Sequence, residues 1–234
     1  MFPSLHGIGL RSGADVVRGA FKSILLAGLS ALAGSVAAFA GQSVTFVVTG
    51  ADARPAAGVV LYFPDVHTPV PASDVVIDQR NEAFMPAIAV APVGSVVQFT
   101  NSDRTSHHVY SFSRPNAFAL PLYKGDARLS QRFASPGVVV LGCNIHDSML
   151  GYIVVVDSTR SGVTGADGRL TLPDVPAGRH AVRAWAPGLD RAAPPEVGQV
   201  DVGASAPASL ALRLGIVVSG PAPRQRGALV GGDY

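Results

Sequence analysis

Apolar and polar residues alternate with a period of two in short runs along most of the chain, which is typical of β-strands with one buried face. The first alternating region covers residues 42–63, and the turn-forming residues 50–55 interrupt it. This region predicts a strand pair that opens a β-sandwich. Further strands are predicted before the single cysteine, at residues 75–77, at 88–99 with a turn at Gly94, at 109–113, at an edge across 118–122, and at 129–142.

Residues 129–142 predict a hairpin that turns at Pro136-Gly137, and its second strand leads directly into Cys143. The Val-rich residues 151–156 predict the strand that follows. The stretch from Cys143 to Met149 would therefore be a short link held by a rigid β framework, which suits a site of fixed geometry.

The second half of the chain repeats the strand pattern on a smaller scale. Residues 162–172 predict two strands joined by a turn at Asp167-Gly168, and a further strand ends near Trp185. Residues 162–214 leave room for few strands, so they predict a small or partial sandwich. The 26 glycines, the 18 prolines and a charged fraction of only 15% support strands and turns rather than long helices. We therefore predict an all-β protein.

Residues 1–40 have the features of an export signal. Arg18 and Lys22 precede about fifteen apolar and small residues, fewer than the roughly 20 of a membrane-spanning helix. Ala38-Phe39-Ala40 has the small-x-small pattern of a cleavage site. We predict cleavage before Gly41, a periplasmic location and no stable membrane insertion afterwards, with an uncleaved anchor as the alternative.

The net positive charge of the chain comes from this segment. Without it the net charge falls from +2 to zero, because Arg11, Arg18 and Lys22 are removed together with Asp15. A chain with this balance has no basic footprint for nucleic acid, so we expect no nucleic-acid partner.

Cys143 is the only cysteine, and His146 and Met149 follow it at intervals of three residues. A single cysteine in an exported protein forms an intermolecular link, stays a reactive thiol or binds a metal. Thiolate, imidazole and thioether are together a ligand set for copper, whereas zinc prefers a fourth cysteine, histidine or carboxylate to methionine. The other interpretations are a plain buried cysteine and a cysteine–histidine nucleophile pair, and Met149 has no role in the second.

A blue-copper ligand set requires one more histidine, and the adjacent His107 and His108 are the candidates. Adjacent strand residues face opposite sides of a sheet, so only one of the two can point into a site. Alternation slightly favours His108, because Tyr110 and Phe112 share its side.

Two longer motifs extend this pattern, namely Gly137 followed after five residues by Cys143-x-x-His146-x-x-Met149-x-Gly151, and Pro92-x-Gly94-x-x-Val97-x-Phe99-x-Asn101. Their spacing resembles that of the cupredoxins, the type 1 copper proteins, and in particular those of the amicyanin and plastocyanin type. In these proteins the first ligand histidine stands six residues after an asparagine, a position that corresponds to His107. The resemblance therefore implies one type 1 copper ion held by His107, Cys143, His146 and the weak axial ligand Met149. Two departures are Ser106, where a proline is common, and His108, where an asparagine usually braces the loop.

The second half resembles carboxypeptidase regulatory-like (transthyretin-like) modules, which are usually non-catalytic. The whole arrangement resembles bacterial exported proteins labelled methylamine utilisation proteins. The implied fold is a Greek-key cupredoxin β-sandwich followed by a small transthyretin-like β-sandwich module. The implied domains are a signal peptide at 1–40, a cupredoxin-like copper domain at 41–157, the regulatory-like module at 158–215 and a disordered tail at 216–234.

The function that the resemblance implies is one-electron transfer by an exported protein that is not an enzyme. Its transient partner would be a c-type cytochrome or a dehydrogenase. Two alternative functions are consistent with the same sequence features. A periplasmic copper chaperone or sensor would bind the ion without electron flow, and a non-redox scaffold would carry the Cys-His-Met cluster by accident.

Overall fold

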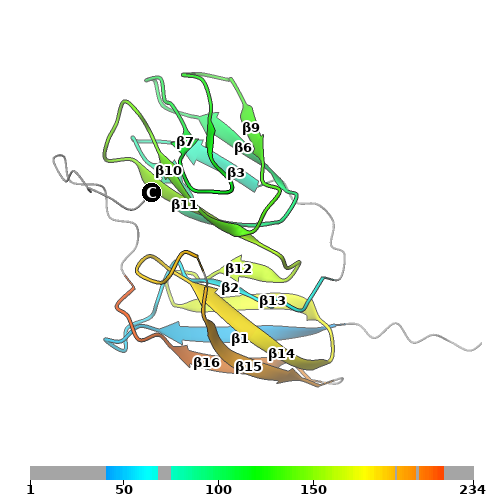
Figure 1. The fold of residues 1–234 in the computed structure, drawn as a ribbon. Coiled ribbons are helices and arrows are strands. Elements are labelled where there is room, and N and C mark those ends of the chain that lie inside the picture. Colours follow the sequence, from blue (N-terminus) through cyan, green and yellow to red (C-terminus); the bar gives the residue numbers. More distant parts are fainter. Residues whose placement is uncertain (1–40, 68–74, 193, 204–205, 219–234) are drawn as a thin grey trace, which may run out of the picture. The chain divides into compact units, whose positions relative to one another are not determined.

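The computed structural model describes residues 41–67, 75–192, 194–203 and 206–218, and these residues form strands and no helix (Figure 1). The all-β prediction is confirmed for this part of the chain. Accordingly, the described ranges offer no helix that is long and apolar enough to cross a membrane. The predicted signal peptide and residues 219–234 of the predicted tail lie outside the described residues.

Nine consecutive strands form the two sheets of one sandwich, which we term the inserted sandwich. One sheet has the strand order β5-β11-β10-β7-β8, and the other has the order β4-β3-β6-β9. The strands are β3 (Val75–Gln79), β4 (Phe84–Met85), β5 (Ile88–Pro92), β6 (Val96–Asn101), β7 (Tyr110–Ser111), β8 (Phe118–Ala119), β9 (Leu129–Arg132), β10 (Gly137–Gly142) and β11 (Leu150–Val156).

The remaining seven strands form the outer sandwich, whose chain is interrupted by the inserted sandwich between β2 and β12. Its sheets have the orders β13-β1-β16 and β12-β2-β14-β15. The strands are β1 (Gln42–Thr49), β2 (Val60–Tyr62), β12 (Ser161–Val163), β13 (Arg169–Val175), β14 (Gly178–Trp185), β15 (Glu196–Val202) and β16 (Ala208–Arg213).

The strands within residues 42–63 pair with distant parts of the chain and not with each other. β1 runs antiparallel to β13 and parallel to β16, while β2 lies between β12 and β14 (Figure 1). The predicted pairing of the two strands within residues 42–63 is therefore wrong. The domain limits predicted at 41–157 and 158–215 also differ from the observed arrangement, in which β1 and β2 pair with strands of the second range. β1 and β2 complete a sandwich for which residues 158–215 hold too few strands. Alternation shows which face of a strand is buried, but it does not identify the partner strand.

The hairpin predicted at residues 129–142 is also wrong. β9 pairs with β6, whereas β10 pairs with β11 and β7, so the connection between β9 and β10 joins the two sheets. The strand predicted after Met149 is β11, and its antiparallel pairing with β10 encloses the stretch from Cys143 to Met149. The short link is therefore present between the two strands that were predicted to flank it, β10 and β11.

Each sandwich has its own apolar core, and a third cluster of buried residues draws on both. Phe46 and Phe63 belong to the core of the outer sandwich, and Phe99 and Phe133 to that of the inserted one. The third cluster includes Tyr62, Ile88, Val154 and Trp185 from four strands of the two sandwiches. The chain leaves the outer sandwich after Val66 and returns at Thr159, whose N–H donates a 3.0 Å hydrogen bond to the Val66 carbonyl. The two chain connections between the inserted and the outer sandwich therefore lie side by side in space, although they are far apart in the sequence.

Candidate metal centre

The loop between β6 and β7 positions His107 through hydrogen bonds at both of its ends. The side-chain amide of Asn101 donates to the Thr105 carbonyl at 3.0 Å and to the Tyr123 carbonyl at 3.1 Å. The backbone of His107 pairs with that of Tyr123 in both directions, at 2.9 and 3.0 Å. These bonds satisfy the polar backbone of a loop whose histidine side chain is fully buried.

Tyr123 is itself held from the opposite sheet. The Gln79 amide at the end of β3 donates to the Tyr123 hydroxyl and to the Thr100 carbonyl. Burial raises the pKa of Tyr123 to about 12, so its hydroxyl is protonated at neutral pH. Tyr123 and Gln79 therefore add no charge of their own close to the buried imidazole.

Three donor atoms converge where this loop meets the link between β10 and β11. The Nδ1 atoms of His107 and His146 lie 3.1 Å apart, and they lie 3.7 and 3.8 Å from the Cys143 sulfur. A point equidistant from three atoms at these separations lies about 2.1 Å from each, within the range of metal–nitrogen and metal–sulfur bonds. The donor triangle therefore fits one metal ion.

The far edge of the His107 ring fixes which nitrogen can bind an ion. Nε2 of His107 lies 2.8 Å from Oδ2 of Asp103. A carboxylate only accepts hydrogen bonds, so Nε2 carries the proton and Nδ1 directs its lone pair toward Cys143. A histidine that ligates a metal is commonly oriented by a carboxylate in this way.

Asp103 is held in turn by two backbone donors. Its carboxylate accepts from the N–H of Asn81 at 2.7 Å and from the N–H of Glu82 at 3.0 Å. Burial raises the pKa of the Asp103 carboxyl, but the hydrogen bonds from Glu82, His107 and Asn81 outweigh it, so the pKa lies below its ordinary value. Asp103 is therefore ionised at neutral pH and able to orient His107.

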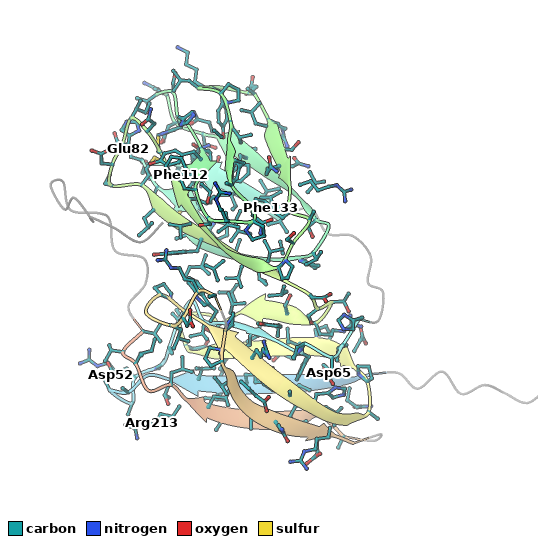
Figure 2. All side chains as sticks on the ribbon, in the orientation of Figure 1. Asp52, Asp65, Glu82, Phe112, Phe133 and Arg213 are labelled. Atoms are coloured by element: carbon teal, nitrogen blue, oxygen red, sulfur yellow. The ribbon has the colours of Figure 1, made fainter. Side chains whose placement is uncertain are left out.

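His146 has a carboxylate at the same edge of its ring, in a more exposed setting. Its Nε2 lies 3.7 Å from Oε1 of Glu82, which is labelled in Figure 2. The side chain of His146 is 16% exposed and that of Glu82 is 56% exposed, whereas His107 is fully buried. Of the three donors, His146 is the one that reaches the surface.

Met149, the fourth predicted ligand, belongs to the same buried cluster as Cys143, and the two are 1% and 3% exposed. The backbone N–H of Met149 donates to the His146 carbonyl at 3.0 Å, which closes the link into a tight turn. The link therefore brings its cysteine and histidine together and buries its methionine beside the same core.

The structure brings His107, and not His108, to Cys143. His108 directs its ring toward Tyr110, with centroids 5.6 Å apart, and its buried Nδ1 has no hydrogen-bond partner among the described residues. The alternation that favoured His108 is misleading because β7 begins only at Tyr110. The spacing of six residues from Asn101 selects the histidine that is found at the cluster.

Two functional candidates have no signal in the sequence, namely Asp103 and Glu82. Both act on the histidines from turns, where residue spacing carries no fixed geometry. Asp103 lies four residues before His107 in the same loop, whereas Glu82 reaches His146 from the turn after β3, which pairs with β6. The histidine of the outer sandwich has only structural partners. Nδ1 of His180 lies 2.8 Å from Asp65 (labelled in Figure 2) and Nε2 lies 2.9 Å from the Pro176 carbonyl.

No protein-family model matches the sequence, and no curated protein matches it. Solved structures give partial matches. A purple cupredoxin from Nitrosopumilus maritimus matches at 23% identity and a TM-score of 0.32, over 35% of this chain and 99% of its own. An oxidised amicyanin variant matches at 22% identity and a TM-score of 0.33, over 41% of this chain and 97% of its own. A copper-containing nitrite reductase from Thermus scotoductus SA-01 matches at 26% identity and a TM-score of 0.34, over 47% of this chain and 28% of its own. At these TM-scores, the assignment of the site rests on the geometry described above.

Proposed function

We propose that the chain binds one copper ion at His107, Cys143, His146 and Met149 and carries single electrons between redox proteins. The observation that carries this proposal is the convergence of two imidazole nitrogens and the Cys143 sulfur on a point about 2.1 Å from each, a metal-bond distance. Two histidines and a cysteine with a weak methionine are the ligand set of electron-transfer copper sites. A copper ion bound there would supply one-electron exchange between its two oxidation states.

The protein residues contribute burial and rigidity to this role. Cys143 and His107 are buried, so the thiolate is shielded from oxidants and from competing ligands. Strand β10 pairs with β11 along its whole length, beginning directly at the link. A link held in this way keeps its donor atoms in place when the charge of the ion changes, which is what rapid electron transfer requires.

Electrons would leave through His146, because its ring is the one that reaches the surface. The partner would be a c-type cytochrome or a dehydrogenase in the periplasm, reached after export by residues 1–40. Redox encounters of this kind bury little surface and are short-lived. The proposal assigns the chain no reaction of its own.

The test is an optical and EPR spectrum of the full chain with Cu(II), compared with the variants His107→Ala, His108→Ala and Cys143→Ser. We expect an intense thiolate-to-copper band in the unmodified protein and in His108→Ala, and its loss in the other two variants. Loss of the band in His108→Ala alone would contradict the ligand assignment. Protein from a copper-supplemented culture that contains no copper would contradict copper binding. Copper without reversible reduction would instead support a chaperone or sensor.

A further inference from the structure

The turn between β3 and β4 contacts the outer edges of both histidines of the metal centre. Arg80 and Ala83 are hydrogen bonded in both directions, which leaves Asn81 and Glu82 as a two-residue hairpin loop. Their φ angles are +54° and +55°, the positive values that a type I′ turn requires at both positions. Asparagine is well suited to this conformation, but glutamate is not.

The backbone of this turn supports His107 indirectly. The N–H groups of Asn81 and Glu82 both donate to the Asp103 carboxylate, and the same carboxylate accepts from Nε2 of His107. These contacts need the backbone of the turn but not the side chain of Glu82. The presence of a glutamate at a position that favours glycine or asparagine therefore requires a separate explanation.

The position of the Glu82 side chain explains the glutamate, because this side chain faces His146. Its Oε1 lies 3.7 Å from Nε2 of His146, on the side of the ring opposite the donor triangle. This separation exceeds the length of a hydrogen bond, so the attraction at this distance is electrostatic. Nδ1 of His146 faces the other two donor atoms, so the ring proton resides on Nε2. The positive end of this N–H group points toward Glu82.

We propose that Glu82 is a positioning residue of the metal centre, which orients the His146 ring and places a negative charge where it favours the more highly charged state of the bound ion. This inference rests on the proposed copper function and adds to it a residue that controls the reduction potential. A negative charge beside a ligand stabilises the oxidised ion relative to the reduced one, so Glu82 lowers the potential. Since Glu82 is more than half exposed, dissolved salt weakens the effect.

The experiment compares midpoint potentials of the copper-loaded full chain, followed by its visible band, for the unmodified protein, Glu82→Gln and Glu82→Asp. Glutamine keeps the length of the side chain and removes its charge, whereas aspartate keeps the charge at a greater distance. We expect the midpoint potential of Glu82→Gln to lie above that of the unmodified protein, and that of Glu82→Asp to rise by less. At high salt, the difference in potential between Glu82→Gln and the unmodified protein should become smaller. The control is Asp126→Asn, which removes an exposed charge from the loop before β9 of the same sandwich.

The outcomes separate this inference from the proposed function. If Glu82→Gln keeps the visible band but its potential equals that of the unmodified protein or of Asp126→Asn, Glu82 is not a positioning residue and the copper function stands. If the unmodified protein shows no thiolate-to-copper band, the copper function fails and the inference fails with it. Thermal unfolding of the metal-free variants provides the structural control, and a merely structural role would change the unfolding temperature without changing the potential.

Discussion

Oδ2 of Asp103 lies 2.8 Å from Nε2 of His107, on the edge of the ring opposite the Cys143 sulfur. The carboxylate and the cysteine sulfur therefore lie on opposite edges of one buried imidazole, and the carboxylate fixes its tautomer and its orientation. This arrangement makes Asp103 the residue outside the donor set on which metal affinity depends most directly.

We expect Asp103→Asn to weaken copper binding by roughly 10- to 100-fold, because an amide orients the imidazole less strongly than a carboxylate and supplies no charge. A competition titration against a chelator of known affinity measures the change. Asp126→Asn, which removes a charge from an exposed loop of the same sandwich, should leave the affinity unchanged. Equal affinities for Asp103→Asn and the unmodified protein would show that the contact does not support the ligand.

The stability of the inserted sandwich should fall in acid because of Asp78. Its carboxylate accepts from the hydroxyls of Thr100 at 2.8 Å and Ser102 at 3.0 Å and lies 3.1 Å from the Arg80 guanidinium, so it ties β3 to β6. Burial raises the pKa of Asp78, but the hydrogen bonds from Ser102 and Thr100 and the charge of Arg80 outweigh it and lower the pKa below its ordinary value. A lowered pKa in the folded state means that the stabilisation is present above the unfolded pKa and is lost as the pH falls through the folded one.

Asp78→Asn should therefore lower the free energy of unfolding by roughly 1–3 kcal/mol near pH 6 and by clearly less near pH 3. Urea unfolding at the two pH values measures this difference between the variant and the unmodified protein. A gap of the same size at both values would mean that the ionised carboxylate contributes nothing beyond its hydrogen bonds.

The outer sandwich should fold without the inserted one. Because Val66 and Thr159 are hydrogen bonded through their backbones, a short Gly/Ser linker from residue 66 to residue 158 should close the chain with little strain. We expect the product to show β-sheet circular dichroism and a cooperative loss of Trp185 fluorescence in urea. Residues 158–218 alone should show neither, because β13 and β16 both pair with the missing β1. A cooperative transition in that shorter fragment would contradict the strand assignment.

Gly168 supports the same sandwich at a close backbone contact. Its φ is +72°, and a Cβ there would lie 3.0 Å from the Ala56 nitrogen and even closer to the Val48 carbonyl oxygen. We expect Gly168→Ala to destabilise the protein by at least about 2 kcal/mol. Gly125→Ala is the matched control, since Gly125 has a φ of +69° and a Cβ added there would meet no atom within 4 Å. The unfolding temperature should fall much further for Gly168→Ala than for Gly125→Ala. Equal decreases would mean that the backbone around Gly168 shifts and accommodates the added methyl group.

The positions of most strands and three converging residues of the site could be predicted from the sequence, but the pairing of strands could not. Alternation in β1 identifies Val44, Phe46 and Val48 as one buried face, and these residues are indeed buried. It contains no information on whether the strand pairs with residues 59–63 or with a strand more than 100 residues away. The partners of β1 and β2 depend on how the two sheets of the sandwich assemble, and this depends on the whole chain.

The site shows the same division between local and distant information. The spacing within Cys143–Met149 is local, because a tight turn between paired strands allows few conformations. Asp103 lies only four residues before His107, but their contact depends on the conformation of the loop after β6, and Glu82 reaches His146 from the turn after β3, which pairs with β6. Sequence spacing therefore identifies the donor residues, but it misses the carboxylates that orient them.

The interruption of one sandwich by another also sets an order for their completion as the chain emerges from its N-terminal end. Every strand of the inserted sandwich lies between Val75 and Val156, so its sheets can close before the rest of the chain has emerged. β1 must instead wait for β13 on one side and β16 on the other, so the earliest strand is completed by the last. Unpaired strands associate readily with other chains. The first strand to emerge is thus the one that stays vulnerable to aggregation longest, until Ala208–Arg213 has taken its place beside it.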